Sequence, residues 1–369
     1  MLISNPLIRR AHQRPLPLSS APDSICILRF SALGDVCHML PVIRSLQSTW
    51  PTTRLTWVIG RLEAELLGDM PGIEFVVFDK STGWLEYLKL HSKFSKRRFD
   101  ILLHMQTSMR ANMASLMIPA DLRLGFDFAR AKDHQAFFTT DRIESTACEH
   151  VMDGFLSFLT TLGIKDKSIQ WDIPVPSEAL DVARKYIPEG QKTLVISPCA
   201  NARFRNFRNW HVEGYAALAD YGIQTHGLRV ILMGGPTALE KQYGEQISKL
   251  VKSPILNLIG KTGLKELLAL LGRATVVLAP DSGPAHIANA AGTPVIGLYA
   301  TTNPSRARAY LSEKWLINQY PEAVRAFLGK SVDEVPWGTR VRNEEAMCLI
   351  KIEAVTQKLD QLMASLSRH

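Results

Sequence analysis

The chain has 369 residues, of which 46% are hydrophobic and 21% charged, and its formal net charge at pH 7 is +8. This composition excludes a disordered chain, and the length exceeds what one ordinary hydrophobic core takes up, so we expect two α/β domains. The sequence has no recognition-helix, RNA-binding or zinc-ligand pattern, so nucleic acid is not an expected partner. The basic charge fits a solvated surface and a phosphate-bearing partner equally well.

The cysteines and the N-terminal segment indicate the compartment. Five cysteines are scattered without CxxC spacing, which is unlike a disulfide framework or a metal site and fits the reducing cytoplasm. Residues 1–23 contain arginines and prolines but no long apolar run, so we expect an N-terminal arm and no signal peptide. No run of about 18 uncharged apolar residues occurs, so any membrane contact should be peripheral.

The first half of the chain alternates short apolar runs with stretches of helical periodicity. After the first run, Val36, Met39, Leu40, Ile43 and Leu46 recur at helical spacing. Strands separated by helix-length segments predict βαβ units and a parallel sheet. The predicted strands are residues 25–30, 55–59, 74–78 and 100–105. We therefore predict an N-terminal Rossmann-like domain over residues 24–175.

The second half repeats this rhythm after residues 171–178 (WDIPVPSE), a proline-bearing stretch that we interpret as the linker between domains. A C-terminal Rossmann-like domain is predicted over residues 176–343. A final helix is predicted within residues 344–369, with packing back on the N-terminal domain as one option. Two such domains should face each other across a ligand cleft. The predicted strands are residues 193–197, 228–233, 255–259, 274–279 and 294–299.

Residues 31–35 (SALGD) end the first predicted strand, where open parallel sheets bind ligands. Gly34 allows a tight turn, and Asp35 begins the next helix. Two interpretations of Asp35 stay open. It either stabilises the helix dipole or takes a proton from an acceptor hydroxyl as a general base.

A second turn, residues 279–286 (APDSGPAH), follows another predicted strand. After Asp281, Ser282 and Gly283 would bring free backbone N–H groups to a ligand, and a helix starting at Pro284 would point its positive end there. This predicts a phosphate site that His286 faces. The alternative is a well-capped helix with a buried histidine.

The loop at residues 197–210 (SPCANARFRNFRNW) carries Arg203, Arg205 and Arg208. Guanidinium groups match phosphate oxygens, so the loop is either an anion clamp or solvated surface charge. Gly234 and Gly235 form a further loop at a strand end. No HExxH motif, paired carboxylates or GxSxG elbow occurs, so neither a metal site nor a serine nucleophile is predicted.

Together these motifs resemble the lipopolysaccharide heptosyltransferase family, whose two Rossmann-like domains form the GT-B fold. The resemblance covers nearly the whole chain. A finer likeness, to the heptosyltransferase I branch that acts on phosphorylated Kdo, comes from FDKSTGW at Phe78 and from the loop at Ser197. The motifs that carry the resemblance are ILRFSALGDVCHMLPVIRSL at Ile27, WVIG at Trp57, GFD at Gly125, HVMDGF at His150, RNW at Arg208, GGP at Gly234, DSGPAHIANAAGTPVIGLY at Asp281 and MCLIKIEAV near the end.

The resemblance implies inverting transfer of L-glycero-D-manno-heptose from ADP-heptose to a Kdo residue of lipid A, with Asp35 as base and no metal or other cofactor required. It also implies peripheral attachment to the cytoplasmic face of the inner membrane. For ADP and the donor sugar, the matching positions are Ser197, Arg208, Thr262, Asp281, Ser282, Gly283 and His286. For the acceptor, we predict Arg29, Ser31, Arg61, Arg130 and Lys132, with solvated surface charge as the alternative for Arg61, Arg130 and Lys132.

The sequence departs from the family at two points. Arg208 stands where relatives have a lysine. Ala238 replaces a glutamate that some relatives place after GGP, and Glu240 follows two residues later, which leaves the adenosine contacts open.

The alternatives are a heptosyltransferase of type II or III, which extends an existing heptose, and a non-catalytic nucleotide-binding module. A nicotinamide dehydrogenase is disfavoured because neither half has GxGxxG after its first strand.

Overall fold

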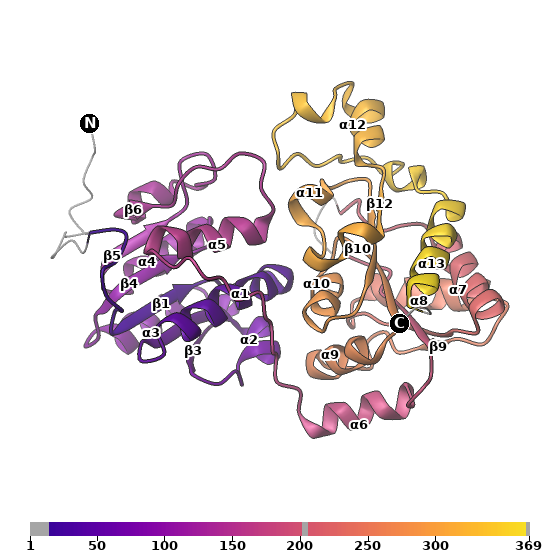
Figure 1. The fold of residues 1–369 in the computed structure, drawn as a ribbon, viewed down its shortest axis with the longest axis horizontal. Helices are drawn as coiled ribbons and strands as arrows, with labels where there is room; N and C mark the ends of the chain where they lie inside the picture. The colour runs from indigo at the N-terminus through magenta and orange to yellow at the C-terminus, as the bar shows by residue number, and fades with distance from the viewer. Residues whose placement is uncertain (1–14, 201–205, 367–369) are drawn as a thin grey trace. The chain divides into compact units, whose positions relative to one another are not determined.

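The computed structural model describes residues 15–200 and 206–366, and the chain divides into two compact units, Met1–Pro174 and Val175–His369 (Figure 1). Each unit contains one six-stranded sheet. All strand pairs within the two sheets are parallel. Because helices connect successive strands, each unit is a succession of βαβ crossovers.

In the first unit the strands lie in the order β3-β2-β1-β4-β5-β6. They are β1 (Ser24–Leu28), β2 (Arg54–Gly60), β3 (Ile73–Phe78), β4 (Phe99–His104), β5 (Ala120–Gly125) and β6 (Asp141–Arg142). The helices are α1 (Leu33–Thr49), α2 (Arg61–Leu67), α3 (Leu85–Phe94), α4 (Met109–Leu116) and α5 (Val151–Leu162), with 3-10 turns η1 (Lys80–Thr82) and η2 (Gln135–Phe138).

In the second unit the order is β12-β11-β10-β7-β8-β9. The strands are β7 (Thr193–Ile196), β8 (Arg229–Leu232), β9 (Leu256–Asn257), β10 (Val276–Pro280), β11 (Val295–Tyr299) and β12 (Leu316–Asn318). The helices are α6 (Ser177–Tyr186), α7 (Val212–His226), α8 (Ala238–Leu250), α9 (Leu264–Arg273), α10 (Gly283–Ala290), α11 (Pro304–Ala307), α12 (Tyr320–Leu328) and α13 (Ile352–Leu366), and 3-10 turns occur at η3 (Tyr310–Trp315), η4 (Val332–Glu334) and η5 (Ala346–Leu349).

Counted from its own first strand, each sheet has the order 3-2-1-4-5-6 of a Rossmann fold, so the prediction of two Rossmann-like domains is confirmed. The strand order reverses between β1 and β4 in the first unit and between β7 and β10 in the second. In open α/β sheets ligands bind outside the carboxyl ends of the strands at this switch point. The loops that follow these four strands are therefore where a site is expected.

The sequence analysis missed three strands, β5, β6 and β12. In β5 the apolar run is interrupted by Arg123, which is buried. Its guanidinium donates to the backbone oxygens of Ile118 (2.9 Å), Ser115 (2.6 Å) and Phe138 (3.0 Å). A charged residue can lie inside a buried strand here because its hydrogen bonds are satisfied.

The C-terminal helix differs from the prediction in its start. It begins at Ile352 rather than near Glu344, because Ile350 is extended and its carbonyl accepts a hydrogen bond from Trp210 Nε1 (3.1 Å). It packs against α7, and its buried side chains, including Val355 and Leu359, belong to the core of the second unit (Figure 1).

The described part of the N-terminal arm is attached to the first unit. The Leu18 N–H donates to Leu162 O (3.1 Å), and the Thr53 hydroxyl donates to Pro22 O (2.6 Å). Residues 15–23 belong to the predicted N-terminal arm, and these hydrogen bonds hold them against the first unit. None of the helices described here is long and apolar enough to cross a membrane.

Candidate active site

Asp35 lies in the first turn of α1, just beyond the end of β1. Its Oδ2 accepts from Arg29 Nη2 (2.5 Å) and from the Ala32 N–H (3.2 Å). Its Oδ1 has no partner among the residues that the structure describes, and the side chain is 33% exposed. One carboxylate oxygen is thus fixed in place while the other is available to accept a proton.

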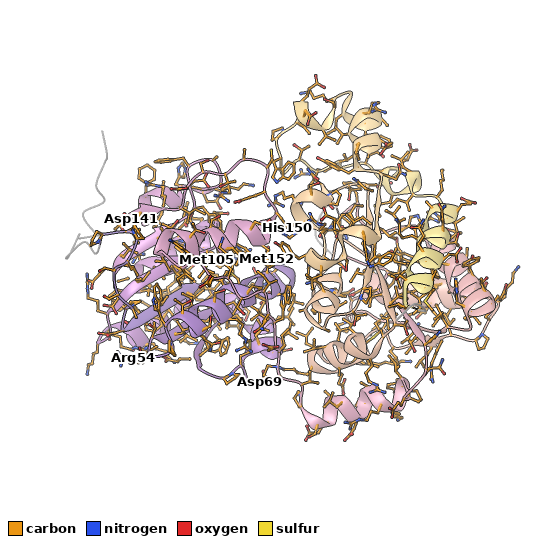
Figure 2. The ribbon with its side chains drawn as sticks, in the orientation of Figure 1. Arg54, Asp69, Met105, Asp141, His150 and Met152 are labelled. Atoms are coloured by element: carbon orange, nitrogen blue, oxygen red, sulfur yellow. The ribbon has the colours of Figure 1, made fainter. Side chains whose placement is uncertain are left out.

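Arg29 is held from several sides. Its Nη1 donates to the carbonyl of Met105, which follows β4 (2.5 Å), and its guanidinium lies 5.0 Å from the ring centroid of Phe155. Phe155 belongs to α5, whose N-cap His150 accepts from the Met152 N–H at 3.1 Å (Figure 2). The switch-point strands and α5 therefore fix Arg29, and Arg29 in turn orients Asp35. Ser31, the other predicted residue of this loop, is half-buried.

A second carboxylic acid, which the sequence analysis missed, lies near this pair. Glu63 in α2 is buried and folds back over Gly60, where a Cβ would lie only 2.5 Å from Glu63 Oε2 and 2.4 Å from Phe30 O. Burial raises the pKa of the Glu63 carboxyl; Arg29 opposes that rise and Asp35 adds to it. Three ionisable groups from two neighbouring strand ends thus interact.

The remaining predicted acceptor residues lie in different settings. Arg61, at the start of α2, is largely exposed and pairs with Asp79 at 3.4 Å. Arg130 is engaged by Asp127 and Glu149, and its Nη2 donates to Glu144 O (2.9 Å). Lys132 is exposed. No hydrogen bond or ion pair within residues 15–200 joins these three to Asp35, and Arg130 has a structural role in its own loop.

The counterpart in the second unit centres on Asp281, at the end of β10. Arg208 Nη1 donates to Asp281 O (2.8 Å) and lies 3.5 Å from its Oδ2, while His286 Nε2 lies 3.8 Å from its Oδ1. Burial alone would raise the pKa of Asp281, but hydrogen bonding from His286 and Thr302 and the charge of Arg208 hold it below its usual value. The group that the sequence predicted at Asp281, Arg208 and His286 is brought together.

Two buried hydroxyls beside this group have no hydrogen-bond partner among the described residues. Ser197 Oγ follows β7 and Ser282 Oγ follows β10, two adjacent strands. Buried polar groups in proteins are nearly always paired, so an unpaired hydroxyl indicates a place for a ligand. Gly283 begins α10 at the same point, with Pro284 in the first turn, so the positive end of the helix is presented there too.

The other described residues predicted to bind the donor are not joined to the Asp281 group. Thr262 is half-buried in the loop before α9, and no hydrogen bond or ion pair within the described residues joins it to Asp281. Glu240 accepts from the Gly235 N–H (2.7 Å) and from the Thr237 hydroxyl (2.5 Å), so the shifted glutamate does reach the GGP turn. Arg203 and Arg205 lie outside the described residues.

Among residues 15–200 and 206–366, no three or more His, Cys, Asp or Glu side chains are grouped so that they could hold an ion. All five cysteines are free. The positive charge at the second site comes instead from Arg208 and the end of α10.

Comparison with known proteins places this geometry in a family. The sequence model of glycosyltransferase family 9 (heptosyltransferase) matches residues 87–326. The lipopolysaccharide core heptosyltransferase OpsX of Haemophilus influenzae is 38% identical over 348 residues, which cover 94% of this chain and 99% of that protein.

Among solved structures, the family 9 glycosyl transferase of Veillonella parvula matches with a TM-score of 0.75 at 20% identity, over 93% of this chain and 97% of that one. Escherichia coli heptosyltransferase WaaC with ADP matches with a TM-score of 0.69 at 16% identity, over 92% and 99% of the two chains. The chain has two Rossmann-like units and a partly exposed aspartate, Asp35, at the first switch point. It belongs to glycosyltransferase family 9, the heptosyltransferases.

Proposed function

We propose that this enzyme transfers L-glycero-D-manno-heptose from ADP-heptose to a hydroxyl of Kdo on lipid A, inverting the anomeric carbon. The observation that carries the proposal is that one chain holds both a carboxylate with an unpaired oxygen, at Asp35, and an anion-receiving turn, at Ser282 and Gly283. A module that only binds nucleotides needs the anion-receiving turn but not the carboxylate. The 38% identity to a lipopolysaccharide core heptosyltransferase supports the choice of sugar and acceptor.

The second unit receives the donor. The N–H groups at the start of α10, the unpaired hydroxyls of Ser197 and Ser282, and the guanidinium of Arg208 would bind the diphosphate. Negative charge grows on ADP as it departs, so groups fixed in advance at this point stabilise the transition state more than the bound donor. Positive charge from Arg208 and the helix end supplies what a divalent metal supplies elsewhere, so no cofactor is required.

The first unit supplies the base. The acceptor hydroxyl oxygen forms a bond to the anomeric carbon, the bond from that carbon to the ADP oxygen breaks, and the hydroxyl proton passes to Asp35 Oδ1. Arg29 keeps the other oxygen occupied, so the carboxylate is held in one orientation. The predicted acceptor contacts remain Arg29, Ser31, Arg61, Arg130 and Lys132.

We also propose that the enzyme acts at the cytoplasmic face of the inner membrane through the exposed side of α3. Trp84, Leu85 and Leu88 are 68%, 48% and 51% exposed, and the opposite side of the helix packs into the core through Leu90 and Phe94. Exposed basic residues, Lys89, His91 and Lys93, extend along the same helix. A helix with exposed tryptophan and leucine beside basic residues suits the headgroup region of an anionic lipid surface.

The direct test is an assay of the full chain with ADP-heptose and defined acceptors: Kdo-lipid A, the same acceptor phosphorylated on Kdo, and an acceptor that already carries heptose. We expect transfer to Kdo with release of ADP, faster on the phosphorylated form, and an inverted anomeric linkage by NMR. Preferential use of the heptosylated acceptor would instead identify a type II or III enzyme. Binding of ADP-heptose without any transfer would leave a nucleotide-binding module.

The membrane proposal is tested by co-sedimentation with vesicles that contain phosphatidylglycerol. We expect Trp84→Ala with Leu88→Ala to weaken binding about 10-fold, since two large apolar contacts are lost. Leu311→Ala, at another exposed leucine in the second unit, is the control and should bind as the unchanged protein does. Equal binding by both variants would show that α3 is not the contact.

A further inference from the structure

Two adjoining cavities in the second unit lie beside the Asp281 group, and most of the residues that line them have no role in the function proposed above. One is lined by Asp281, Thr302, Asn303, Arg306 and Arg340, among others. The other is lined by Arg208, Thr302, Arg340 and Arg342, among others. Thr302 and Arg340 line both cavities, which therefore adjoin, and the two together are called the hollow below.

The hollow has an excess of positive charge. Arg306, Arg340 and Arg342 make no ion pair with any residue in the described part of the chain. The carboxylate in the lining belongs to Asp281, and Arg208 and His286 already lie against it. Three arginines without an ion pair among the described residues thus line the hollow, and two of them, Arg340 and Arg342, are exposed. A local excess of positive charge favours the binding of an anion.

Backbone bonds fix the segment that brings two of these arginines. Arg340 pairs with Thr302 in an antiparallel bridge, and the Val341 N–H donates to Thr301 O (3.0 Å). The hydroxyl of Tyr320, which is buried in the core, donates to Thr339 O (3.0 Å). The arginines are thus pre-positioned next to the end of β11, which lowers the entropic cost of binding a ligand there.

On the opposite wall, Arg306 comes from α11. A Cβ on Gly338 would lie 3.7 Å from Arg306 Nε, so this guanidinium reaches the segment that carries Arg340. Asn303 Oδ1 accepts from the Ser305 N–H (3.0 Å), which leaves its amide nitrogen as a donor. The segment with Arg340 and Arg342 lies beyond residue 326, where the family match ends.

We propose that this hollow binds a phosphoryl group, at a position distinct from the diphosphate site at the start of α10. Guanidinium groups bind phosphate oxygens in pairs of parallel hydrogen bonds, and several arginines around one small hollow fit a doubly charged phosphate ester better than a carboxylate. Resting on the proposed function, this group is the phosphate ester of the acceptor sugar.

The first experiment does not depend on transfer activity. Binding of inorganic phosphate to the full chain is measured calorimetrically, with and without saturating ADP. We expect binding that the double variant Arg306→Gln with Arg340→Gln weakens about 10- to 100-fold, the range for losing charge-assisted hydrogen bonds. Arg325→Gln, an exposed arginine of α12 outside the lining, is the matched control and should bind normally. Melting temperatures confirm that both variants fold.

The source of the phosphoryl group follows from two comparisons. Phosphate binding that survives saturating ADP, with a 10- to 100-fold loss of kcat/KM only on the phosphorylated acceptor, assigns the hollow to the acceptor. Phosphate that ADP displaces, with equal losses on both acceptors, would place it in the diphosphate site and overturn the proposal of a separate site. No phosphate binding by the unchanged protein, or equal binding by the double variant, overturns the proposal. Phosphate binding without heptose transfer would sustain this site while refuting the proposed function.

Discussion

Each unit places an aspartate and an arginine at its switch point, but the two pairs leave different atoms unpaired. In the first unit, Arg29 lies 2.5 Å from Asp35, whose side chain is 33% exposed and keeps one oxygen free. In the second, Arg208 Nη1 lies 3.5 Å from Asp281 Oδ2, and the Asp281 side chain is 12% exposed. The free atoms there are the hydroxyls of Ser197 and Ser282 and the N–H groups at the start of α10. A free acceptor atom suits proton uptake, and free donors suit anion binding. The same fold and the same two residue types, aspartate and arginine, therefore suit different chemistry in the two units.

The strongest test of this contrast is Asp35→Asn. If Asp35 is the base, kcat should fall about 10²- to 10⁴-fold while ADP affinity stays the same, because the proton is transferred only in the transition state. Melting temperature is measured on the same sample, and asparagine also suits a helix start, so stability should change by less than about 1 kcal/mol. A variant with near-normal kcat would reduce Asp35 to a helix-stabilising residue.

The second test addresses Arg208. Arg208→Ala removes a charge-assisted hydrogen bond to Asp281 and a contact to the donor diphosphate, and we expect donor use to weaken by about 1.5–3 kcal/mol. Steady-state kinetics with varied ADP-heptose measures the loss, with Arg325→Ala as an exposed control. Unchanged kinetics would mean that the second unit binds its anion without this side chain.

The third test separates structural arginines from binding ones within the first unit. Arg130→Ala breaks the pairs with Asp127 and Glu149, and it should cost about 1–3 kcal/mol in the free energy of unfolding because two largely buried carboxylates lose their partner. Lys132→Ala, two residues away and exposed, should change stability by less than about 0.5 kcal/mol. Urea denaturation measures the free energy of unfolding of both variants. Equal stability of the two would contradict a structural role for Arg130.

The smallest expected effect concerns Glu63, whose pKa is raised by burial. The protonated form is favoured in the folded state, so its contribution to stability is present at low pH and is lost as the pH rises through the folded pKa. Glu63→Gln cannot ionise and should therefore match the unchanged protein in acid and melt about 1–3 °C higher at pH 8. Glu65→Gln, exposed on the same helix, should show no such pH dependence. An equal rise in the melting temperature of Glu63→Gln in acid and at pH 8 would indicate an effect of packing and not of ionisation.

Local signals in the sequence were enough to locate both switch points. SALGD and APDSGPAH each combine an apolar run, a turn and a helix start, and all three features are decided by neighbouring residues. The strand order is then limited by the rules for βαβ units. Arg123 hid β5, because a charge in a buried strand is tolerated only through carbonyls supplied by other segments.

Other features of the two sites depend on contacts that local patterns do not contain. Glu63 in the first turn of a helix is typical of a dipole-stabilising residue, and only its fold back over Gly60 places it near Arg29. Arg130 is a predicted acceptor contact, and its ion pair with Glu149 on another segment is not visible in the local pattern. Arg306 and Arg340 line one cavity because residues 339–341 return beside the end of β11.

The hydrogen bond from Trp210 to the carbonyl of Ile350 ties the loop of Arg208 to the chain just before α13. The loop that carries Arg208, the arginine proposed to bind the donor, is therefore anchored by a residue 140 positions after Trp210. A ribosome must synthesise the chain through Ile350 before this loop can acquire its anchor. Premature termination upstream of Ile350 would leave the residues of the first unit, including Asp35, complete, but the Arg208 loop would lack this hydrogen bond.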